Sequence, residues 1–377
     1  MRFVSPLLKE VVYPSMAEAG TFRSIARQGV AVITYHGLLP DGYSPIDPGF
    51  DGRLITAAGF RHQLQLLRTR YNVISPEEMK AWARGEQELP ARAALLTCDD
   101  GLLSNLTDML PILLEEGLRC LFFITGGSLG HQRAMLWYDE LLLMFLRARA
   151  GEFALSCEGV DLVGALEEPQ QRRALWWTAV KQLSSIDADQ RKRFLHAAHS
   201  YFDLEPAVQF YRRSYSLAER HCCLMTADEI RQLAAAGMTI GAHTMTHPIL
   251  SHMPPTLAWH EIVNCKMRLE SVLDKEVWAF SYPFGDPASV SPSIFTMARR
   301  AGFEMSFLNV GGGLGASLPL HAIPRIHVST GMTLGEFEAH VSGFYELLRR
   351  IFSPVPRDIS PVPDAMPAAQ IANLPRA

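Results

Sequence analysis

The chain has 377 residues, of which 48% are hydrophobic and 20% are charged, as is usual for a globular protein that buries a sizeable core. Its net charge of -4 and the absence of a basic arm argue against nucleic acid or an anionic membrane as the main partner. No stretch of the sequence reaches the length of a membrane span without charges.

The N-terminus and the cysteines bear on where the protein works. The N-terminal segment does not look like a signal peptide, because Lys9, Glu10 and Arg23 interrupt its apolar residues. The six cysteines have no zinc-ribbon spacing. Cys98 and Cys120 lie in apolar strand-like runs, where cysteine behaves as a small buried hydrophobe. Reduced thiols and a cytoplasmic location are the simplest interpretation.

Short runs of β-branched and aromatic residues alternate with amphipathic helical runs along the chain. This alternation predicts parallel strands wrapped by helices. The expected strands are 30–35, 93–98, 120–125, 239–242, 277–282 and 323–328. The expected helices include 57–70, 106–116, 227–236, 257–273 and 292–301. A capping box at Thr226 and Glu229 predicts the start of the third of these helices, and Gly237 sits at its C-cap position.

The pattern divides the chain into five regions. An N-terminal extension (1–27) precedes the first part of the α/β region (28–134), and an aromatic-rich, largely helical insertion (135–223) separates this from the second part (224–352). The Pro-rich tail (353–377) cannot bury enough surface to fold and is expected to be disordered. The insertion is interpreted as a helical subdomain with its own small core. The alternative is that its rim also forms a substrate lid or a partner surface.

A helix is expected near the end of the second part. Residues 337–352 place aromatic and aliphatic side chains on one helical face. That face is expected to pack on the rest of the protein. Peripheral docking to a membrane surface, aided by Arg349 and Arg350, is the alternative hypothesis.

Two polar motifs point to chemistry. One hydrophobic run ends in Asp99 and Asp100, and a separate stretch carries His243 and His247. Residues four apart lie on one face of a helix, so the two imidazoles would be close enough to share an ion. One aspartate oxygen as a third ligand leaves a coordination position open for water, as in catalytic zinc sites. The adjacent aspartate points elsewhere and can act as a base.

These residues resemble the first two motifs of the polysaccharide deacetylases, the carbohydrate esterase family with the NodB-type domain. Thr97–Gly101 resembles the first motif and His243–His247 the second. The likeness covers about 28–330 apart from the insertion, and it continues at 35–36, 111–114, 122–124, 247–251 and 280–285. Either motif alone is common as a turn or as structural histidines. Together they imply the distorted (β/α)7 TIM-like barrel of this family, with a helical insertion.

The resemblance implies a role for each motif residue. Asp100, His243 and His247 would hold a divalent metal, most simply zinc, with cobalt or nickel as alternatives. Asp99 would be the general base that takes a proton from the attacking water. The metal would lower the pKa of that water and polarise the acetamide carbonyl.

Two histidines compete for the role of general acid, which must protonate the leaving amine. His36, in the run Tyr35-His36-Gly37, resembles the general acid of the poly-N-acetylglucosamine deacetylases. His327 lies where more typical family members carry theirs, although its local motif matches them poorly. We favour His36.

The third motif departs from the family pattern. The oxyanion would be stabilised by the backbone N–H of Phe284, within the substrate-side run Tyr282, Pro283 and Phe284. Typical members have an arginine in this motif that orients the base, whereas Ser281 and Tyr282 stand here. Arg325 is the candidate replacement. This departure also resembles the poly-N-acetylglucosamine branch.

The function that follows is metal-dependent hydrolysis of an N-acetyl group on an amino sugar. A cytoplasmic protein would act on a sugar precursor, a lipid-linked glycan or a glycosylated small molecule. One alternative is hydrolysis of a non-sugar amide or imide by the same barrel. A catalytically silent carbohydrate-binding barrel is another, although the intact aspartate and histidine pairs weigh against it.

Overall fold

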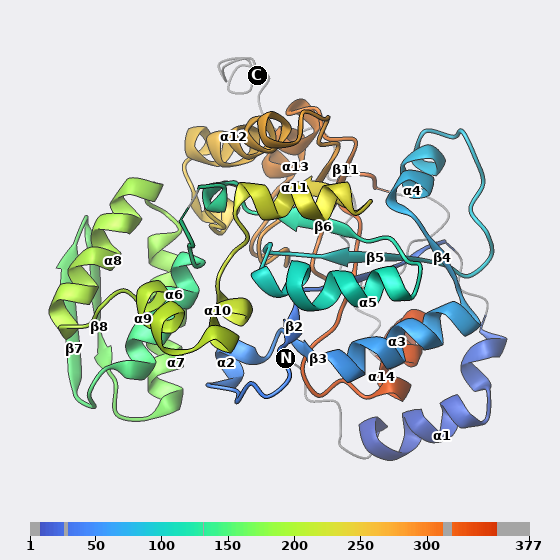
Figure 1. Ribbon diagram of the computed structural model, residues 1–377, viewed down its shortest axis with the longest axis horizontal. Helices are drawn as coiled ribbons and strands as arrows, with labels where there is room; N and C mark the ends of the chain where they lie inside the picture. The colour runs from blue at the N-terminus through green and yellow to red at the C-terminus, as the bar shows by residue number, and fades with distance from the viewer. Residues whose placement is uncertain (1–7, 26–28, 131, 312–318, 353–377) are drawn as a thin grey trace.

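The computed structural model describes residues 8–25, 29–130, 132–311 and 319–352. Its centre is a curved sheet of eight parallel strands in the order β11-β10-β9-β6-β5-β1-β12, with β4 paired to β5 (Figure 1). These strands are β1 (Ala31–Tyr35), β4 (Asn72–Ile74), β5 (Ala93–Cys98), β6 (Leu121–Ile124), β9 (Thr239–Ala242), β10 (Ala279–Ser281), β11 (Met305–Phe307) and β12 (Ile326–His327).

The sheet curls into a distorted barrel. Its edges are β11 and β12, and the described link between them is an isolated bridge between Phe307 of β11 and Ile323, in the segment that leads into β12. On its other side, β12 pairs with β1. β1 and β5 run in register from Ala31 opposite Ala94 to Tyr35 opposite Cys98, and both strands are buried along their whole length. Such strands are largely apolar because both faces of a parallel sheet are covered.

Helices cover the outside of this sheet. In Figure 1, α11, α12 and α13 lie on one side of the strands, and α3 and α5 lie on the other. Their apolar faces meet the strands in the main core, which includes Phe60, Ile230, Ile262 and Phe280. The helices are α3 (Ala57–Arg70), α4 (Pro76–Ala83), α5 (Leu110–Glu115), α11 (Ala227–Ala235), α12 (Pro255–Leu273) and α13 (Pro292–Arg300). This confirms the predicted α/β fold, a distorted barrel.

The insertion folds against the barrel rather than apart from it. Its helices α6, α7 and α8 enclose a core with Phe145, Phe153 and Phe194, and the same core includes Leu102 and Ile249 of the barrel. It also contains an antiparallel hairpin that the sequence analysis did not predict. Its elements are α6 (Trp137–Arg147), β7 (Glu152–Cys157), β8 (Val160–Ala165), α7 (Pro169–Leu183), α8 (Ala188–Phe202), α9 (Ala207–Ser214) and α10 (Ser216–Cys222).

The prediction of one helix over 337–352 is wrong. The structure has α14 (Leu334–Val341) and α15 (Phe344–Phe352), because Gly343 adopts a φ of 85° that ends the first helix. Phe337 of α14 is buried in the main core, whereas Phe344 of α15 lies 5.4 Å, ring to ring, from Phe22. The predicted tail, 353–377, lies outside the described residues.

The N-terminal segment packs against α14. Tyr13 of α1 (Tyr13–Glu18) shares a small buried cluster with Phe22 and with Ala339 of α14. Within the described ranges, none of the helices has the length and apolar character needed to cross a membrane.

Candidate metal centre

The two aspartates stand at the carboxyl end of β5. The N–H of Asp99 continues the ladder by donating to the Tyr35 carbonyl at 2.9 Å, and the chain then turns sharply. Asp100 has a φ of 75° and Gly101 a φ of 83°. This turn sends the two carboxylates in different directions, and both are buried, with 2% and 1% of the residue exposed.

The two histidines follow β9, but not on a helix, so that prediction is wrong. Residues 243–249 form an irregular loop in which Thr244 has a φ of 62° and His247 a φ of 58°. The physical reason is Pro248, because a residue before proline is disfavoured in the helical region. The Thr244 hydroxyl accepts a hydrogen bond from the His247 N–H at 3.0 Å, and this turn brings the two rings to 4.8 Å.

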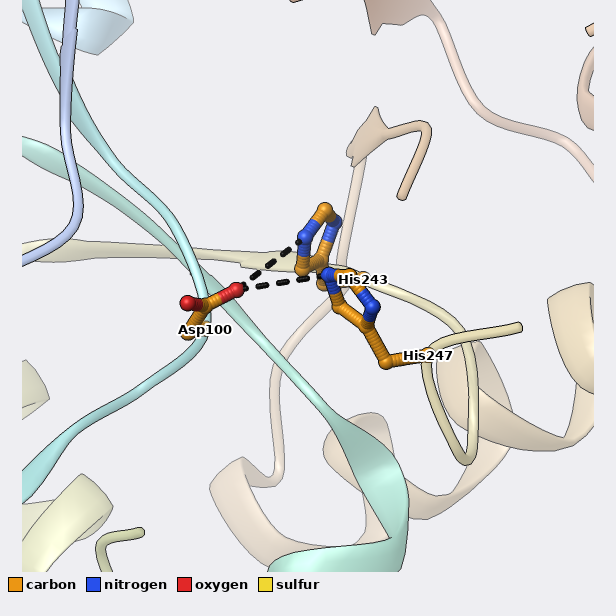
Figure 2. A group of neighbouring side chains, drawn as sticks. All are labelled: Asp100, His243 and His247. Carbon is orange, nitrogen blue, oxygen red and sulfur yellow. Dashed lines mark ion pairs between the residues drawn. The ribbon is translucent and has the colours of Figure 1, made fainter. Parts of the chain in front are cut away.

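Asp100, His243 and His247 converge on one point (Figure 2). Oδ1 of Asp100 lies 3.6 Å from Nε2 of His243 and 3.4 Å from Nε2 of His247. Nδ1 of His243 lies 2.7 Å from the Ser281 carbonyl, which can only accept, so this nitrogen carries the proton and Nε2 keeps its lone pair. Burial also lowers the pKa of His247 and favours its neutral form.

The donor set fits a divalent cation. The two carboxylate oxygens of Asp100 are buried and have no hydrogen-bond partner among the described residues. Such an orphaned carboxylate is costly unless something else satisfies it. One candidate ligand atom from each of Asp100, His243 and His247 lies within 4.8 Å of the other two. Two imidazoles and a carboxylate are ligands that zinc accepts in catalytic sites.

Asp99 is held by Arg325, the contact that the sequence analysis proposed. Nη1 and Nη2 of Arg325 donate to Oδ1 and Oδ2 of Asp99 at 2.7 and 2.5 Å. The Ser281 hydroxyl, in the position of the missing arginine, donates to Oδ2 at 3.2 Å. Burial alone would raise the pKa of Asp99, but the charge and hydrogen bonds of Arg325, together with His243 and His36, outweigh burial and hold the pKa below its usual value. Asp99 is therefore an ionised, oriented carboxylate.

Both candidate acids reach the site. His36 follows β1 and His327 belongs to β12, and their ring centroids lie 5.0 Å apart. Burial lowers the pKa of His36 to about 3 and that of His327 to about 4. Both imidazoles are thus neutral near pH 7, and position alone does not separate them.

Two residues of the third motif contact the candidate ligands, Ser281 through its carbonyl and Phe284 through its ring. The Phe284 ring lies 5.0 Å from the His247 ring, and the Phe284 backbone has a φ of 59°. Tyr282 is fully buried and its hydroxyl donates to the His321 carbonyl at 2.9 Å, so its side chain is committed to the core. Pro283 is buried beside it.

The sequence analysis missed residues that the fold brings to the centre from elsewhere. Tyr138 of α6 lies 5.0 Å, ring to ring, from His247 and 5.7 Å from Phe284. Arg53 places Nε 3.3 Å from Oδ2 of Asp100 and pairs with Asp139. The abundance of aromatic residues in the insertion was the one available signal. For Arg53 there was none, because nothing in its neighbourhood marks a site.

Comparisons with known proteins agree with this geometry. Residues 205–306, which include both histidines and the third motif, match the family model described as Polysaccharide deacetylase. The protein named "Putative polysaccharide deacetylase YxkH" of Bacillus subtilis (strain 168) is 23% identical over 280 residues, or 74% of this chain and 67% of that protein.

Solved structures share the fold. The Streptococcus pyogenes deacetylase PplD in complex with acetate superposes with a TM-score of 0.52 at 17% identity, covering 84% of this chain and 99% of that one. IcaB from Ammonifex degensii superposes with a TM-score of 0.50 at 18% identity, covering 83% of this chain and 97% of that one.

Proposed function

We propose that this chain is a polysaccharide deacetylase, a carbon–nitrogen hydrolase, and that it removes the N-acetyl group of an amino sugar with the help of a divalent metal, most simply zinc. The observation that carries the proposal is a pair of adjacent carboxylates with separate environments. Asp100 faces two imidazoles, whereas Asp99 is bound by Arg325. One carboxylate is thus available as a ligand and the other as a base.

The chain's own groups divide the reaction between them. A cation held by Asp100, His243 and His247 would polarise the acetamide carbonyl and lower the pKa of water. Asp99 takes one proton from the attacking water, whose oxygen bonds to the carbonyl carbon. The backbone N–H of Phe284 donates to the oxygen that becomes negative.

Breaking the carbon–nitrogen bond then requires a proton on the leaving amine. His36 and His327 are neutral near pH 7 because burial lowers both pKa values. The acid therefore gains its proton during turnover, and we propose that the proton taken up by Asp99 is its source. We assign the acid role to His36, with His327 as the alternative. Protons balance, since water loses one and the amine gains one.

Aromatic side chains support a sugar as the substrate. Tyr138 and Phe284 adjoin His247, and Trp177 lies 5.8 Å, ring to ring, from Phe284. Phe284 and Trp177 are partly exposed. Aromatic faces of this kind pack against the C–H face of a pyranose ring, while a few polar groups set its orientation.

For the substrate itself we propose a glycan or glycoconjugate. The departures in the third motif support a likeness to the poly-N-acetylglucosamine branch. If the protein works in the cytoplasm, its substrate would be a sugar precursor, a lipid-linked glycan at the inner membrane face or a glycosylated small molecule. Contact with that membrane would be peripheral.

The test is acetate release from a panel of N-acetylated sugars, nucleotide sugars and lipid-linked glycans, with metal content measured in parallel. Wild type should release acetate, and Asp99→Asn should lose turnover while keeping the metal. Asp189→Asn, an exposed residue of α8, is the matched control and should behave as wild type. Metal loss in Asp99→Asn would mean that the roles of Asp99 and Asp100 are exchanged.

Two experimental outcomes would each support a different function. Release of acyl groups from simple amides or imides but not from sugars would favour the non-sugar hydrolase. A chain that binds little zinc and releases no acetate, yet retains glycans, would be a silent carbohydrate-binding barrel.

A further inference from the structure

An arginine links the insertion to the metal-ligand carboxylate. Arg53 lies between α2 (Pro48–Asp51) and β3 (Ile55–Thr56), and its Nη1 and Nη2 donate to Oδ1 and Oδ2 of Asp139 at 3.0 and 2.5 Å. Its third nitrogen, Nε, lies 3.3 Å from Oδ2 of Asp100. Asp139 belongs to α6 of the insertion, and the Asp139 and Asp100 side chains are each 1% exposed.

The two carboxylate oxygens of Asp100 have different neighbours. Oδ1 faces the two histidines, whereas Oδ2 faces the guanidinium. A carboxylate with one oxygen beside a fixed cation presents the other oxygen to a metal. Because both terminal nitrogens of Arg53 donate to Asp139, the planar guanidinium is held in one orientation.

A second link holds the histidine loop. Thr246 directly precedes His247, and Glu261 of α12 accepts from its N–H at 2.7 Å and from its hydroxyl at 2.5 Å. Arg191 of α8 donates to the same Thr246 hydroxyl and lies 3.4 Å from Oε1 of Glu261. Its other terminal nitrogen donates to the Ile186 carbonyl at 2.7 Å, within the insertion. The Arg191 side chain is 2% exposed.

We infer that the insertion is an integral part of the metal centre and not an appended subdomain. Through Asp139 and Arg53 it selects which oxygen of Asp100 faces the metal. Through Arg191 and Thr246 it fixes the turn that presents His247. Arg53, Asp139 and Arg191 are positioning residues, since each acts through a ligand-bearing segment. The inference rests on the proposed metal-dependent function.

The first link is tested with Co²⁺ alone as the probe, by its visible absorption and by its affinity in competition with a chelator. Asp139→Asn keeps the shape of the side chain, and Arg53→Met keeps its length without the charge. We expect Co²⁺ affinity to fall about 10–100-fold in each, as for outer-sphere partners of metal ligands. In Arg53→Met, Asp100 is free to bind through both oxygens, so the coordination number rises and the cobalt absorption weakens.

The second link has a matched control on the same helix. Arg191→Met removes the buried guanidinium, whereas Arg193→Met removes one whose side chain is 57% exposed and paired with Glu158 at the surface. Thr246→Val removes the shared hydroxyl and leaves the contacts of Arg191 with its own insertion intact. We expect Arg191→Met and Thr246→Val to weaken Co²⁺ binding about 10-fold or more, with Arg193→Met unchanged.

The outcomes separate the two proposals. Variants with native far-ultraviolet dichroism and the wild-type cobalt spectrum and affinity would overturn this inference alone. A wild-type chain that binds no Co²⁺ would overturn the proposed function as well. If Arg53→Met fails to fold, Asp139→Asn and Thr246→Val decide, because each alters polar contacts with little change of volume.

Discussion

Removal of Arg325 gives the sharpest test of how Asp99, the proposed base, is held. The guanidinium is fully buried and donates to Asp99 through both terminal nitrogens, and Nε donates to the Leu308 carbonyl at 2.8 Å. Arg325→Met retains most of the side-chain volume but leaves the Asp99 carboxylate buried without its counter-ion. Loss of one partner of a buried ion pair costs about 3–5 kcal/mol. That is a large part of the total stability of about 5–15 kcal/mol typical of a folded protein.

The loss of stability in Arg325→Met comes from the unpaired charge of buried Asp99. Removing that charge should therefore restore part of the lost stability. In the double variant Asp99→Asn/Arg325→Met neither ion remains. We expect it to be more stable than the sum of the two single variants predicts, by about 2–3 kcal/mol. Arg231→Met, whose side chain is 52% exposed in a surface pair, is the control and should change stability by less than about 0.5 kcal/mol.

The assay is urea unfolding with linear extrapolation, in chelator so that metal binding does not add to the measured free energy. Acetate release is measured on the same proteins with metal restored. Additivity of the two single variants within about 0.5 kcal/mol would refute the buried-pair reasoning. Full turnover in Arg325→Met would refute the role of Arg325 in orienting Asp99.

Three further predictions concern the scaffold. Burial would raise the pKa of Asp51, but hydrogen bonds from a buried imidazole and two backbone N–H groups outweigh burial and lower this pKa. The contribution of Asp51 to stability is therefore present above its unfolded-state pKa of about 3.9, and it is lost as the pH falls through the folded-state value. The difference in unfolding free energy between wild type and Asp51→Asn should therefore shrink in acid; a constant difference would contradict this. Gly241→Ala puts a methyl group 2.6 Å from the Phe123 ring and should cost about 1–3 kcal/mol in urea unfolding, unlike Gly130→Ala, whose methyl group has its nearest neighbour at 3.9 Å, an ordinary van der Waals contact. Ellman's reagent should react with Cys157 in the native protein and with six thiols after unfolding, because the other five cysteines are buried and none is paired; fewer thiols would indicate a disulfide.

Local patterns were sufficient where local physics decides the structure. The buried run 93–98 and the amphipathic run 57–70 match β5 and α3 residue for residue. The capping box at Thr226 and Glu229 is present, and Gly237 has a φ of 87° at the end of α11. Each of these features is determined by residues close together in the chain, so it can be predicted from the local sequence.

Other features depend on contacts between distant parts of the chain or on competing local signals. The spacing of His243 and His247 indicated a helix, although Pro248 argued against it and the structure has a loop. The hairpin of β7 and β8 is partly exposed and weakly patterned, and it was missed. Arg53 and Arg191 are single arginines whose partners lie far away in the chain, and no neighbouring motif distinguishes them from surface arginines.

The position of the insertion has a consequence for how the proposed metal ion would be acquired. Asp100 and the two histidines lie on opposite sides of the insertion in the chain, so an unfolded polypeptide would have to close a very long loop to bring all three side chains to one ion. Nascent chains should therefore compete poorly for metals, and loading becomes a step that follows barrel assembly. Which ion is captured is then decided by what is abundant around the finished protein, not during its synthesis.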